Sequence, residues 1–206
     1  MTLISRRTLL LTGSTMAALA ALGLPALAVD IAALNKPPEL GEMALGPDDA
    51  KVTIIEYASA TCPHCAAFHK GAYKQLKSEY IDTGKIRFVF REFPLNDAAL
   101  AAFMIARAAP KEAYFPMIDV FFETLETWAK NPAQGLLDIA KQAGFTQEKF
   151  DATLRDEALA KGILAIRDGG SGFGVKGTPS FFINGEMFEG ERTFDSFKAA
   201  IDPLLQ

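Results

Sequence analysis

Cysteine is scarce in this sequence of 206 residues, which contains two, and histidine is equally scarce, also with two. The cysteines are Cys62 and Cys65, so a disulfide between them would close a very small ring. A structural disulfide stabilises a protein mainly by closing a longer loop of the unfolded chain. The scarcity therefore excludes a disulfide framework, and the close spacing predicts that this pair performs chemistry.

Metal ligands are correspondingly few. A zinc site needs about four ligands, and only His64 and His69 accompany the two cysteines. Covalent haem attachment needs a histidine directly after the second cysteine, where this chain has Ala66. We therefore expect no metal ion and no cofactor, and we expect His69 to be a solvated residue on a helix.

A surplus of positive charge is also absent. The chain has 21 Lys and Arg against 25 Asp and Glu, which gives a formal net charge of -4 at pH 7. Proteins that bind nucleic acid through their surface usually present a basic face. The composition therefore predicts no nucleic-acid partner.

The first 29 residues contain no acidic side chain. Arg6 and Arg7 precede residues 9–24, which are apolar or small apart from a few hydroxyl residues. This stretch is shorter than the roughly 18 residues of a membrane span, and an Ala-x-Ala pattern ending at Ala28 suits a signal peptidase. We therefore expect residues 1–28 to be a signal peptide that is cleaved after Ala28, by either the Sec or the twin-arginine route.

Strand and helix patterns alternate at both ends of the remaining chain. β-Branched and apolar residues over 51–58 predict a strand that is buried on both faces. A helical spacing follows over 66–81, and a second strand pattern covers 85–93. Later signals predict, in chain order, a strand over 180–183, a hairpin turn at Asn184 and Gly185, a returning strand over 186–189 and a helix capped by Thr193.

The middle of the chain has only helical signals. Residues 96–167 show successive helical patterns separated by proline and glycine, and the glycine cluster at 169–174 predicts a flexible return to the sheet. Four aromatic residues of this segment are expected to pack mainly in its core, and any exposed member could contact unfolded substrates: Phe115, Phe121, Phe122 and Trp128.

These patterns predict an α/β protein with a thioredoxin-like fold and an inserted helical domain. A strand–helix–strand unit joined to a β-hairpin and a closing helix is the thioredoxin arrangement. The predicted boundaries are an N-terminal arm over 29–50, a thioredoxin-like domain over 51–95 and 170–206, and an inserted helical domain over 96–169.

Cys62-Pro63-His64-Cys65 occupies a predicted strand-to-helix junction. The thiolate is the nucleophilic form of cysteine, and Cys62 at a helix N-terminus faces unpaired N–H groups and the positive end of the helix dipole. A protonated His64 would add positive charge close by. Both effects lower the pKa of Cys62, so we expect Cys62 to be the nucleophile and the more buried Cys65 to be the resolving thiol.

Two motifs carry a family resemblance. Cys62-Pro63-His64-Cys65 follows the strand that contains Glu56, and Gly177-Thr178-Pro179-Ser180 follows the helical segment. In this order they resemble the DsbA family of bacterial periplasmic disulfide oxidoreductases, from about residue 51 to the C-terminus. The resemblance implies a periplasmic dithiol oxidase that donates its disulfide to unfolded or reduced exported proteins. It also implies reoxidation by a DsbB-like membrane quinone reductase.

The resemblance adds a substrate-binding segment. Pro179 matches the family's cis-proline, and the backbone of Thr178 would then pair with an extended stretch of substrate. Without the family context, a trans proline that begins an edge strand is the alternative. Thr178 stands where the best-known DsbA has Val, and Thr also occurs at this place in disulfide isomerases.

The resemblance also gives Glu56 a role. It matches the family's buried acid, which would have its pKa raised by burial and would relay protons for Cys65. The alternatives are a solvated Glu56 or a Glu56 paired with Lys51 or Arg91.

Three functional classes stay open. The first is the dithiol oxidase. The second is a disulfide reductase or isomerase of the same superfamily, although residues 29–50 are too short for the dimerisation domain that precedes the fold in the isomerases. The third is a chaperone-like or metal-binding module. The chain is expected to act as a monomer.

Overall fold

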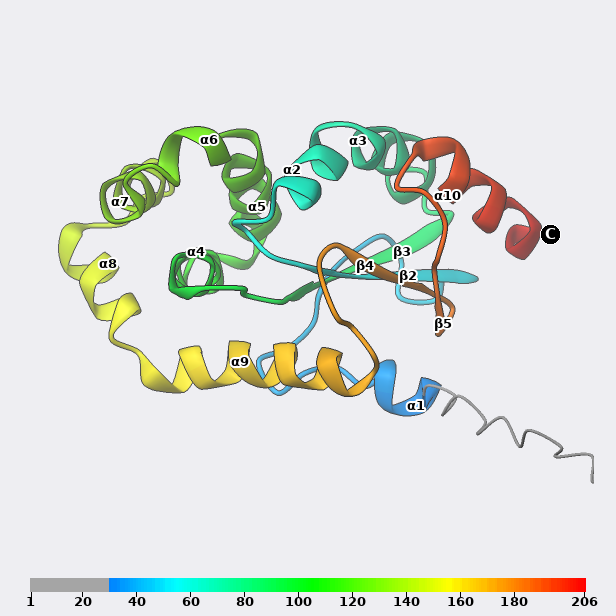
Figure 1. The fold of residues 1–206 in the computed structure, drawn as a ribbon, viewed down its shortest axis with the longest axis horizontal. Helices are drawn as coiled ribbons and strands as arrows, with labels where there is room; N and C mark the ends of the chain where they lie inside the picture. Colours follow the sequence, from blue (N-terminus) through cyan, green and yellow to red (C-terminus); the bar gives the residue numbers. More distant parts are fainter. Residues whose placement is uncertain (1–29) are drawn as a thin grey trace, which may run out of the picture.

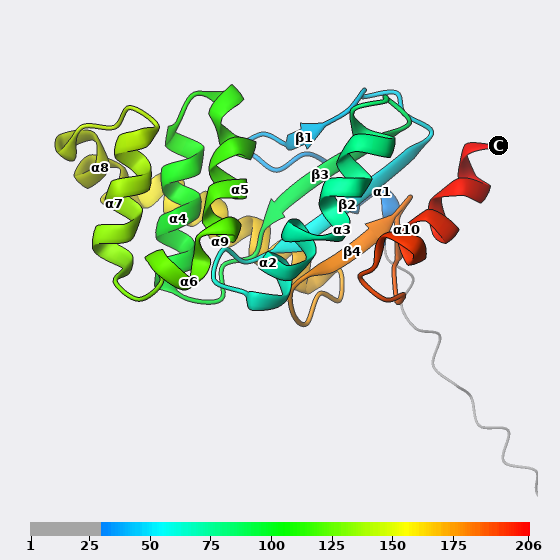
Figure 2. The ribbon, with the colours of Figure 1, turned by 90° about the horizontal axis from the view of Figure 1, so that it is seen from above.

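The computed structural model describes residues 30–206, and the predicted signal peptide, with Arg6, Arg7 and the cleavage site at Ala28, lies outside the described residues. A five-stranded sheet with helices on both faces forms one part of the protein, and a group of helices beside it forms the other (Figure 1; Figure 2). Within residues 30–206, no helix combines the length and the apolar character that a membrane crossing requires.

The sheet consists of five strands, β1 (Met43–Leu45), β2 (Val52–Ala58), β3 (Ile86–Glu92), β4 (Ser180–Ile183) and β5 (Glu186–Met187). Their order is β1-β3-β2-β4-β5, with β2 and β3 parallel and the other neighbours antiparallel. β2 is central, and every residue in it except Thr53 is buried. The prediction of a strand buried on both faces is therefore confirmed, whereas β5 ends before the predicted residue 189.

One face of the sheet is covered by α2 (Pro63–Lys70), α3 (Ala72–Leu76), the π-helical turn η1 (Lys77–Ile81), α10 (Phe194–Ile201) and the 3-10 turn η3 (Asp202–Leu205) (Figure 1). The sequence predicts one continuous helix over 66–81, and this prediction is wrong at Gly71. There the backbone leaves the helical region, with φ -115° and ψ -99°. Glycine permits the break because no Cβ restricts its backbone.

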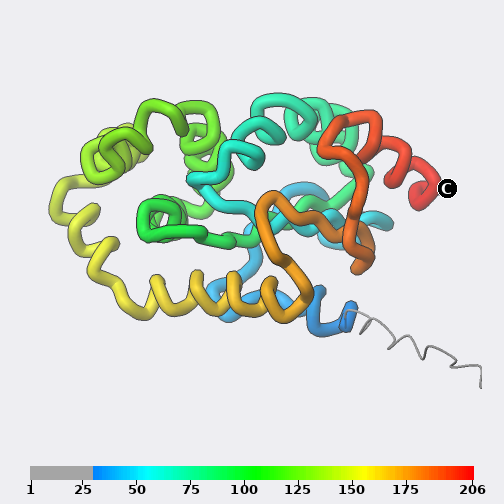
Figure 3. The backbone as a smooth tube through the Cα atoms, viewed as in Figure 1, coloured from blue at the N-terminus to red at the C-terminus, as the bar shows by residue number. Residues whose placement is uncertain are grey.

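Between β3 and β4 the chain forms helices, as the sequence predicts. They are α4 (Asp97–Ala108), the 3-10 turn η2 (Lys111–Ala113), α5 (Tyr114–Glu123), α6 (Leu125–Trp128), α7 (Pro132–Gln142), α8 (Gln147–Leu154) and α9 (Glu157–Gly172). Figure 3 follows the chain as it leaves the sheet after β3 and returns along α9. Three of the four aromatic residues considered above are buried, and Phe115 is partly buried against the same core.

α9 lies on the opposite face of the sheet (Figure 1). The prediction of a flexible glycine-rich return over 169–174 is wrong, because α9 continues to Gly172 and includes Gly169 and Gly170. Gly170 lies directly against Tyr57 of β2, where an added Cβ would come within 2.6 Å of the ring. The missing side chain therefore lets the helix pack closely on the sheet.

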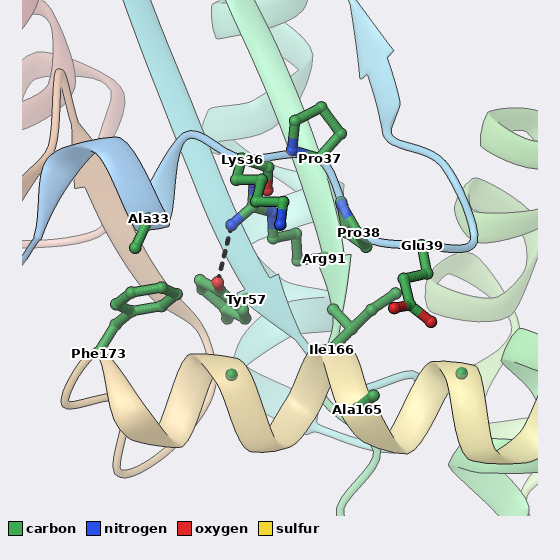
Figure 4. A pocket seen from close by; sticks show the side chains of 12 residues that line it. Ala33, Lys36, Pro37, Pro38, Glu39, Tyr57, Arg91, Ala165, Ile166 and Phe173 are labelled. Carbon is green, nitrogen blue, oxygen red and sulfur yellow. Dashed lines mark hydrogen bonds between the residues drawn. The ribbon is translucent and has the colours of Figure 1, made fainter.

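The N-terminal arm carries two elements that its irregular sequence does not predict, α1 (Ile31–Leu34) and the edge strand β1. Arg91 of β3 anchors the arm, since its guanidinium donates to Leu34 O at 2.7 Å and to a Glu42 carboxylate oxygen at 2.8 Å. The same group donates to the Tyr57 hydroxyl at 3.0 Å. A cavity of about 290 Å³ lies between the arm, these side chains and α9 (Figure 4).

Candidate active site

Cys62 is the N-cap residue of α2, directly beyond the turn that follows β2. Its backbone N–H donates to Ser59 O at 3.0 Å, its conformation is extended, and Pro63 takes the first helical position. Proline suits that position because a backbone N–H there would have no partner within the helix. The Cys62 side chain is 6% exposed, and Cys65, one turn later, is completely buried. The sulfur of Cys62 is thus the one that a partner can reach.

Hydrogen bonds lower the pKa of Cys62 from 9.0 to about 5. The largest contribution comes from the Cys65 thiol, which more than offsets burial, and the Thr178 side chain and the N–H groups of Cys65 and His64 act in the same direction. These bonds favour the charged thiolate because a thiolate is the stronger acceptor. His64 contributes through its backbone N–H, while its imidazole is exposed.

The pKa of Cys65 is displaced in the opposite direction. Burial raises it most, and the hydrogen bond to Cys62 and the negative charge of Glu56 raise it further. One thiol therefore loses its proton readily and the other retains it. Cys62 can attack or leave as a thiolate, whereas Cys65 needs a nearby base before it can attack.

Thr178 and Pro179 come from the far end of the sequence and lie beside Cys62. Ser180 pairs with Tyr57 at the start of β4, which places the two preceding residues at the end of β2 where the redox turn begins. The Cys62 thiol donates to the carbonyl oxygen of Thr178 at 3.2 Å. The Thr178–Pro179 peptide bond is cis. The fold therefore brings together the two motifs that the helical segment separates in sequence.

Glu56 is completely buried on β2, and its Oε2 lies 2.9 Å from Nε2 of His69 on α2. The expectation that His69 is solvated is wrong, since its side chain is 3% exposed. Its ring stacks on Phe122 with centroids 4.3 Å apart and packs against Tyr73 at 4.4 Å. Residues of α3 and α5 therefore bury a histidine that a helix in isolation would expose.

The alternative partners of Glu56 make their contacts elsewhere. Lys51 donates to Leu205 O at 3.2 Å, and Arg91 pairs with Glu42. Sequence reasoning singled out Glu56 and missed His69, because one histidine on a helix forms no pattern. The signal that could have found it is the spacing from Cys65, which places His69 one helical turn later on the same face.

A polar network around the redox turn was not predicted from the sequence. Thr61 Oγ1 lies 3.3 Å from Ser59 Oγ and accepts a hydrogen bond from Asn96 Nδ2 at 3.1 Å. The backbone N–H of Leu95 donates to Ser59 Oγ at 3.3 Å. These bonds tie the turn before Cys62 to the loop between β3 and α4. Asn96 is also the N-cap of α4, where its Oδ1 accepts a hydrogen bond from the backbone N–H of Ala99 at 2.9 Å.

In the part of the chain that the structure describes, the two cysteines do not belong to a larger set of ligands. Across residues 30–206, no three His, Cys, Asp or Glu side chains converge as the ligands of a metal ion would. The chemistry that the described site offers is thiol–disulfide exchange at Cys62, with a buried carboxyl–imidazole pair close to Cys65.

Comparison with known sequences gives a consistent result. Residues 39–203 match the family described as Thioredoxin. A putative protein-disulfide oxidoreductase of Rickettsia bellii is 35% identical over 173 residues, which cover 80% of this chain and 65% of that protein. A probable disulfide bond formation protein D of Bacillus cereus is 29% identical over 175 residues, which cover 80% of this chain and 79% of that protein. The chain thus spans less than two thirds of the length of the Rickettsia relative.

Comparison with solved structures identifies the same fold. A variant of alpha-DsbA1 from Wolbachia pipientis, in which two cysteines are replaced by alanine, is 30% identical to this chain. It superposes with a TM-score of 0.78, covering 85% of this chain and 95% of that one. Oxidised BdbD from Bacillus subtilis superposes with a TM-score of 0.70 at 23% identity, covering 82% of this chain and 96% of that one. At that lower identity the likeness concerns the fold alone.

Proposed function

The chain belongs to the DsbA family of thioredoxin-like disulfide oxidoreductases, and we propose that it donates its Cys62–Cys65 disulfide to reduced client proteins. The observation that carries the proposal is the opposite displacement of the two pKa values, to about 5 for Cys62 and upward for Cys65. The groups that stabilise a Cys62 thiolate have no charge to stabilise in the disulfide. They therefore favour the reduced enzyme and make the disulfide an oxidant.

Client oxidation proceeds by two exchanges. A client thiolate attacks the sulfur of Cys62, the Cys62–Cys65 bond breaks, and its electron pair passes to Cys65, which takes up a proton. A second client thiolate attacks the client sulfur of the mixed disulfide, and Cys62 leaves as a thiolate. The client loses two electrons and two protons. Both electrons reach the enzyme, one proton remains on Cys65 and the other enters the solvent.

The client segment is proposed to lie along Thr178 and Pro179. The pairing of β4 with β2 begins at Ser180, and within residues 30–206 neither Thr178 nor Pro179 takes part in a strand pairing. An extended peptide can add to such a segment through main-chain hydrogen bonds. Because Thr178 O lies 3.2 Å from the Cys62 sulfur, this docking would bring the client cysteine to the reactive thiol.

The proposed setting is the periplasm, and the proposed clients are reduced or unfolded exported proteins. Export is supported by Arg6 and Arg7 before the apolar residues 9–24 and by the Ala-x-Ala pattern ending at Ala28. Each catalytic cycle leaves two electrons on the enzyme, so an acceptor must remove them. A DsbB-like membrane quinone reductase would do so, and the enzyme would act as a monomer.

Transfer of the disulfide to a reduced peptide with two cysteines tests the proposal. Oxidised protein at pH 7 should form one peptide disulfide per enzyme, and its equilibrium with glutathione should favour the reduced enzyme. Cys62→Ser should abolish transfer, and Cys65→Ser should accumulate mixed disulfide. An enzyme that retains its disulfide beside the reduced peptide would be a reductase instead. A Cys62→Ser variant that protects unfolded clients as well as the wild type would indicate a chaperone-like module.

A further inference from the structure

Client oxidation leaves a proton on Cys65 and reoxidation must remove it, yet Cys65 and Glu56 are both completely buried. We propose that His69 conducts this proton between the Glu56 carboxyl and the solvent, through a cavity that opens beside Asp119. The inference rests on the proposed function, because thiol–disulfide exchange is what places the proton on Cys65. His69 is a positioning residue in this scheme, since it acts through Glu56 and does not touch the sulfurs.

Glu56 has a single protein partner within the described chain. Its Oε2 lies 2.9 Å from His69 Nε2, and its Oε1 has no hydrogen-bond partner among residues 30–206. The charge of Glu56 nevertheless reaches Cys65, whose pKa it raises. A carboxyl with no exposed surface cannot exchange protons directly with bulk water. Each proton that Glu56 passes to Cys65 must therefore be replaced through a neighbour that can both donate and accept.

His69 has the geometry of such a neighbour. Its Nε2 faces Glu56, whereas its Nδ1 has no hydrogen-bond partner in the described part of the chain and lies 4.0 Å from Asp119 Oδ1. A direct hydrogen bond would need about 3 Å, so this gap suits a bridging water. A neutral imidazole has a donor on one nitrogen and an acceptor on the other, so it can pass a proton across the ring by exchanging tautomers.

A cavity of about 140 Å³ lies on the outer side of His69. Asp119 and Tyr73 line it, together with titratable side chains toward its rim: Lys70, Lys74, Lys77 and Glu123. A water molecule occupies about 30 Å³ of liquid volume, so a polar cavity of this size can hold several. The Asp119 side chain is 45% exposed, which connects the cavity to the solvent. Burial raises the pKa of Asp119, which helps it to carry a proton at this opening.

Aromatic packing holds the His69 ring in place between these two ends. Phe122 stacks on one side with an interplanar angle of 28°, Tyr73 packs at 4.4 Å, and Phe90 lies 6.0 Å away edge-on. Nε2 of the held ring faces Glu56 and Nδ1 faces Asp119, so the proposed route to Glu56 passes through the imidazole. A phenylalanine could fill the same space and stack in the same way. Packing alone therefore gives no reason for a histidine here.

The proton transfers balance at each step. When the bond to Cys62 breaks, the Glu56 carboxylate takes the Nε2 proton of His69 and passes it to the Cys65 sulfur. Nδ1 of His69 takes a proton from cavity water in exchange, and the solvent replaces that proton. Reoxidation runs the same transfers in reverse, as Cys65 gives up its proton before it attacks. Cys65 alone ends each half-cycle with a changed number of protons, and His69 alternates between its two neutral tautomers from one half-cycle to the next.

Chemical rescue of His69→Ala separates proton conduction from packing. The variant should oxidise the two-cysteine peptide about 100-fold more slowly in a single turnover, as expected for a lost proton-transfer group. Added imidazole can enter through the adjoining cavity and should restore the rate, and imidazoles of different pKa should restore it in order of basicity. Pyrrole, which fills the same space without accepting a proton, should not. Equal rescue by pyrrole would overturn the proposal.

Milder variants cover the case in which His69→Ala does not fold. His69→Gln retains a polar contact with Glu56 but lacks an exchangeable tautomer, and it should remain slow. Asp119→Asn should slow turnover several-fold and change its pH profile, whereas Glu126→Gln, an exposed acid on α6, should have no effect. A His69→Gln enzyme with the wild-type rate would overturn the proton route.

The activity of the wild-type enzyme distinguishes a failure of the proposed function from a failure of the proton route through His69. If it does not oxidise the peptide at all, the proposed function fails. If it oxidises the peptide and His69→Gln matches its rate, the proposed function stands and only the route through His69 fails.

Discussion

The sulfur of Cys62 lies 3.2 Å from the carbonyl oxygen of Thr178, which is 116 positions further along the chain. Two groups of Thr178 act on this sulfur in opposite directions. The carbonyl accepts from the thiol and so favours the protonated form, whereas the side chain favours the thiolate. Because the pKa of Cys62 is about 5, the hydrogen bonds that favour the thiolate outweigh the preference of this carbonyl for the protonated thiol. In the proposed docking, a client N–H would take over this carbonyl without removing a group that stabilises the thiolate.

The pKa values of the Cys62 and Cys65 thiols should differ widely. Alkylation of reduced protein by iodoacetamide should follow a pKa of about 5 at Cys62, and Cys65 should stay unmodified because it is completely buried. Peptide mapping by mass spectrometry assigns each modification. A midpoint for Cys62 close to the value of about 8.5 for free cysteine would contradict the described hydrogen bonding.

Removal of the His64 backbone donor should weaken the thiolate. His64→Pro deletes an N–H that lowers the pKa of Cys62, so that pKa should rise by about one unit, the order of one hydrogen bond to a charged group. His64→Ala retains the N–H and should leave most of the effect in place. The absorbance of the thiolate at 240 nm reports both titrations. A larger rise in His64→Ala than in His64→Pro would assign the effect to the imidazole instead.

The Thr178 hydroxyl can be removed without altering its carbonyl. Thr178→Val should raise the pKa of Cys62 and shift the glutathione equilibrium toward the disulfide, because a group that stabilises the thiolate is lost. Folding should be little affected, since valine keeps the β-branched shape of threonine. Thr178→Ser is the matched control and should behave like the wild type. The prediction fails if valine and serine give the same equilibrium constant.

The reduced enzyme should unfold at a higher temperature than the oxidised one at pH 7. Cys62 has its pKa lowered from 9.0 to about 5 in the folded protein, so its contribution to stability is complete above pH 9. It decreases as pH falls from 9 toward 5 and is absent below 5. The expected difference at pH 7 is about 5 °C, at roughly 2–4 °C per kcal/mol for a domain of this size.

Thermal scans with and without reductant, between pH 4 and pH 9, measure this difference. It should grow with pH across that interval. An oxidised form that is clearly more stable at pH 7 would remove the support for an oxidase and favour the reductase alternative.

Two neighbouring glycines of α9 should respond oppositely to alanine. A Cβ at Gly170 would meet the Tyr57 ring at 2.6 Å, so Gly170→Ala should destabilise the fold by about 1–3 kcal/mol. A Cβ at Gly169 would meet nothing within 4 Å, so Gly169→Ala should stabilise the helix by up to about 1 kcal/mol. Urea unfolding of both variants measures the difference. Equal effects would show that α9 does not pack on Tyr57 as described.

The sequence was enough to predict those structural elements that are determined by residues close together in the chain. The apolar run of β2 is buried on both faces, the redox motif begins a helix, and Thr193 caps the helix that it was expected to cap. Each of these depends on residues that are close together in sequence. The chain order of strands and helices was then enough to indicate the fold class.

The sequence did not predict features that depend on contacts between residues far apart in the chain. The burial of His69 depends on Phe122 in α5, and the close packing of α9 at Gly170 depends on the ring of Tyr57. The order of the arm depends on Arg91, whose guanidinium holds Glu42 and the carbonyl of Leu34. In each case tertiary contact overrides a weak local preference. The proposed route from Cys65 to the surface belongs to this class, and the sequence indicated only its first member, Glu56.

The lengths of the two outermost strands bear on how the protein meets unfolded chains. β1 has three residues and β5 has two. A long free edge would offer unpaired N–H and C=O groups to any extended polypeptide and invite irreversible association. With edges this short, an unfolded client has little backbone to pair with at either side of the sheet. The proposed docking segment before β4 would then be the place where a client pairs, beside Cys62.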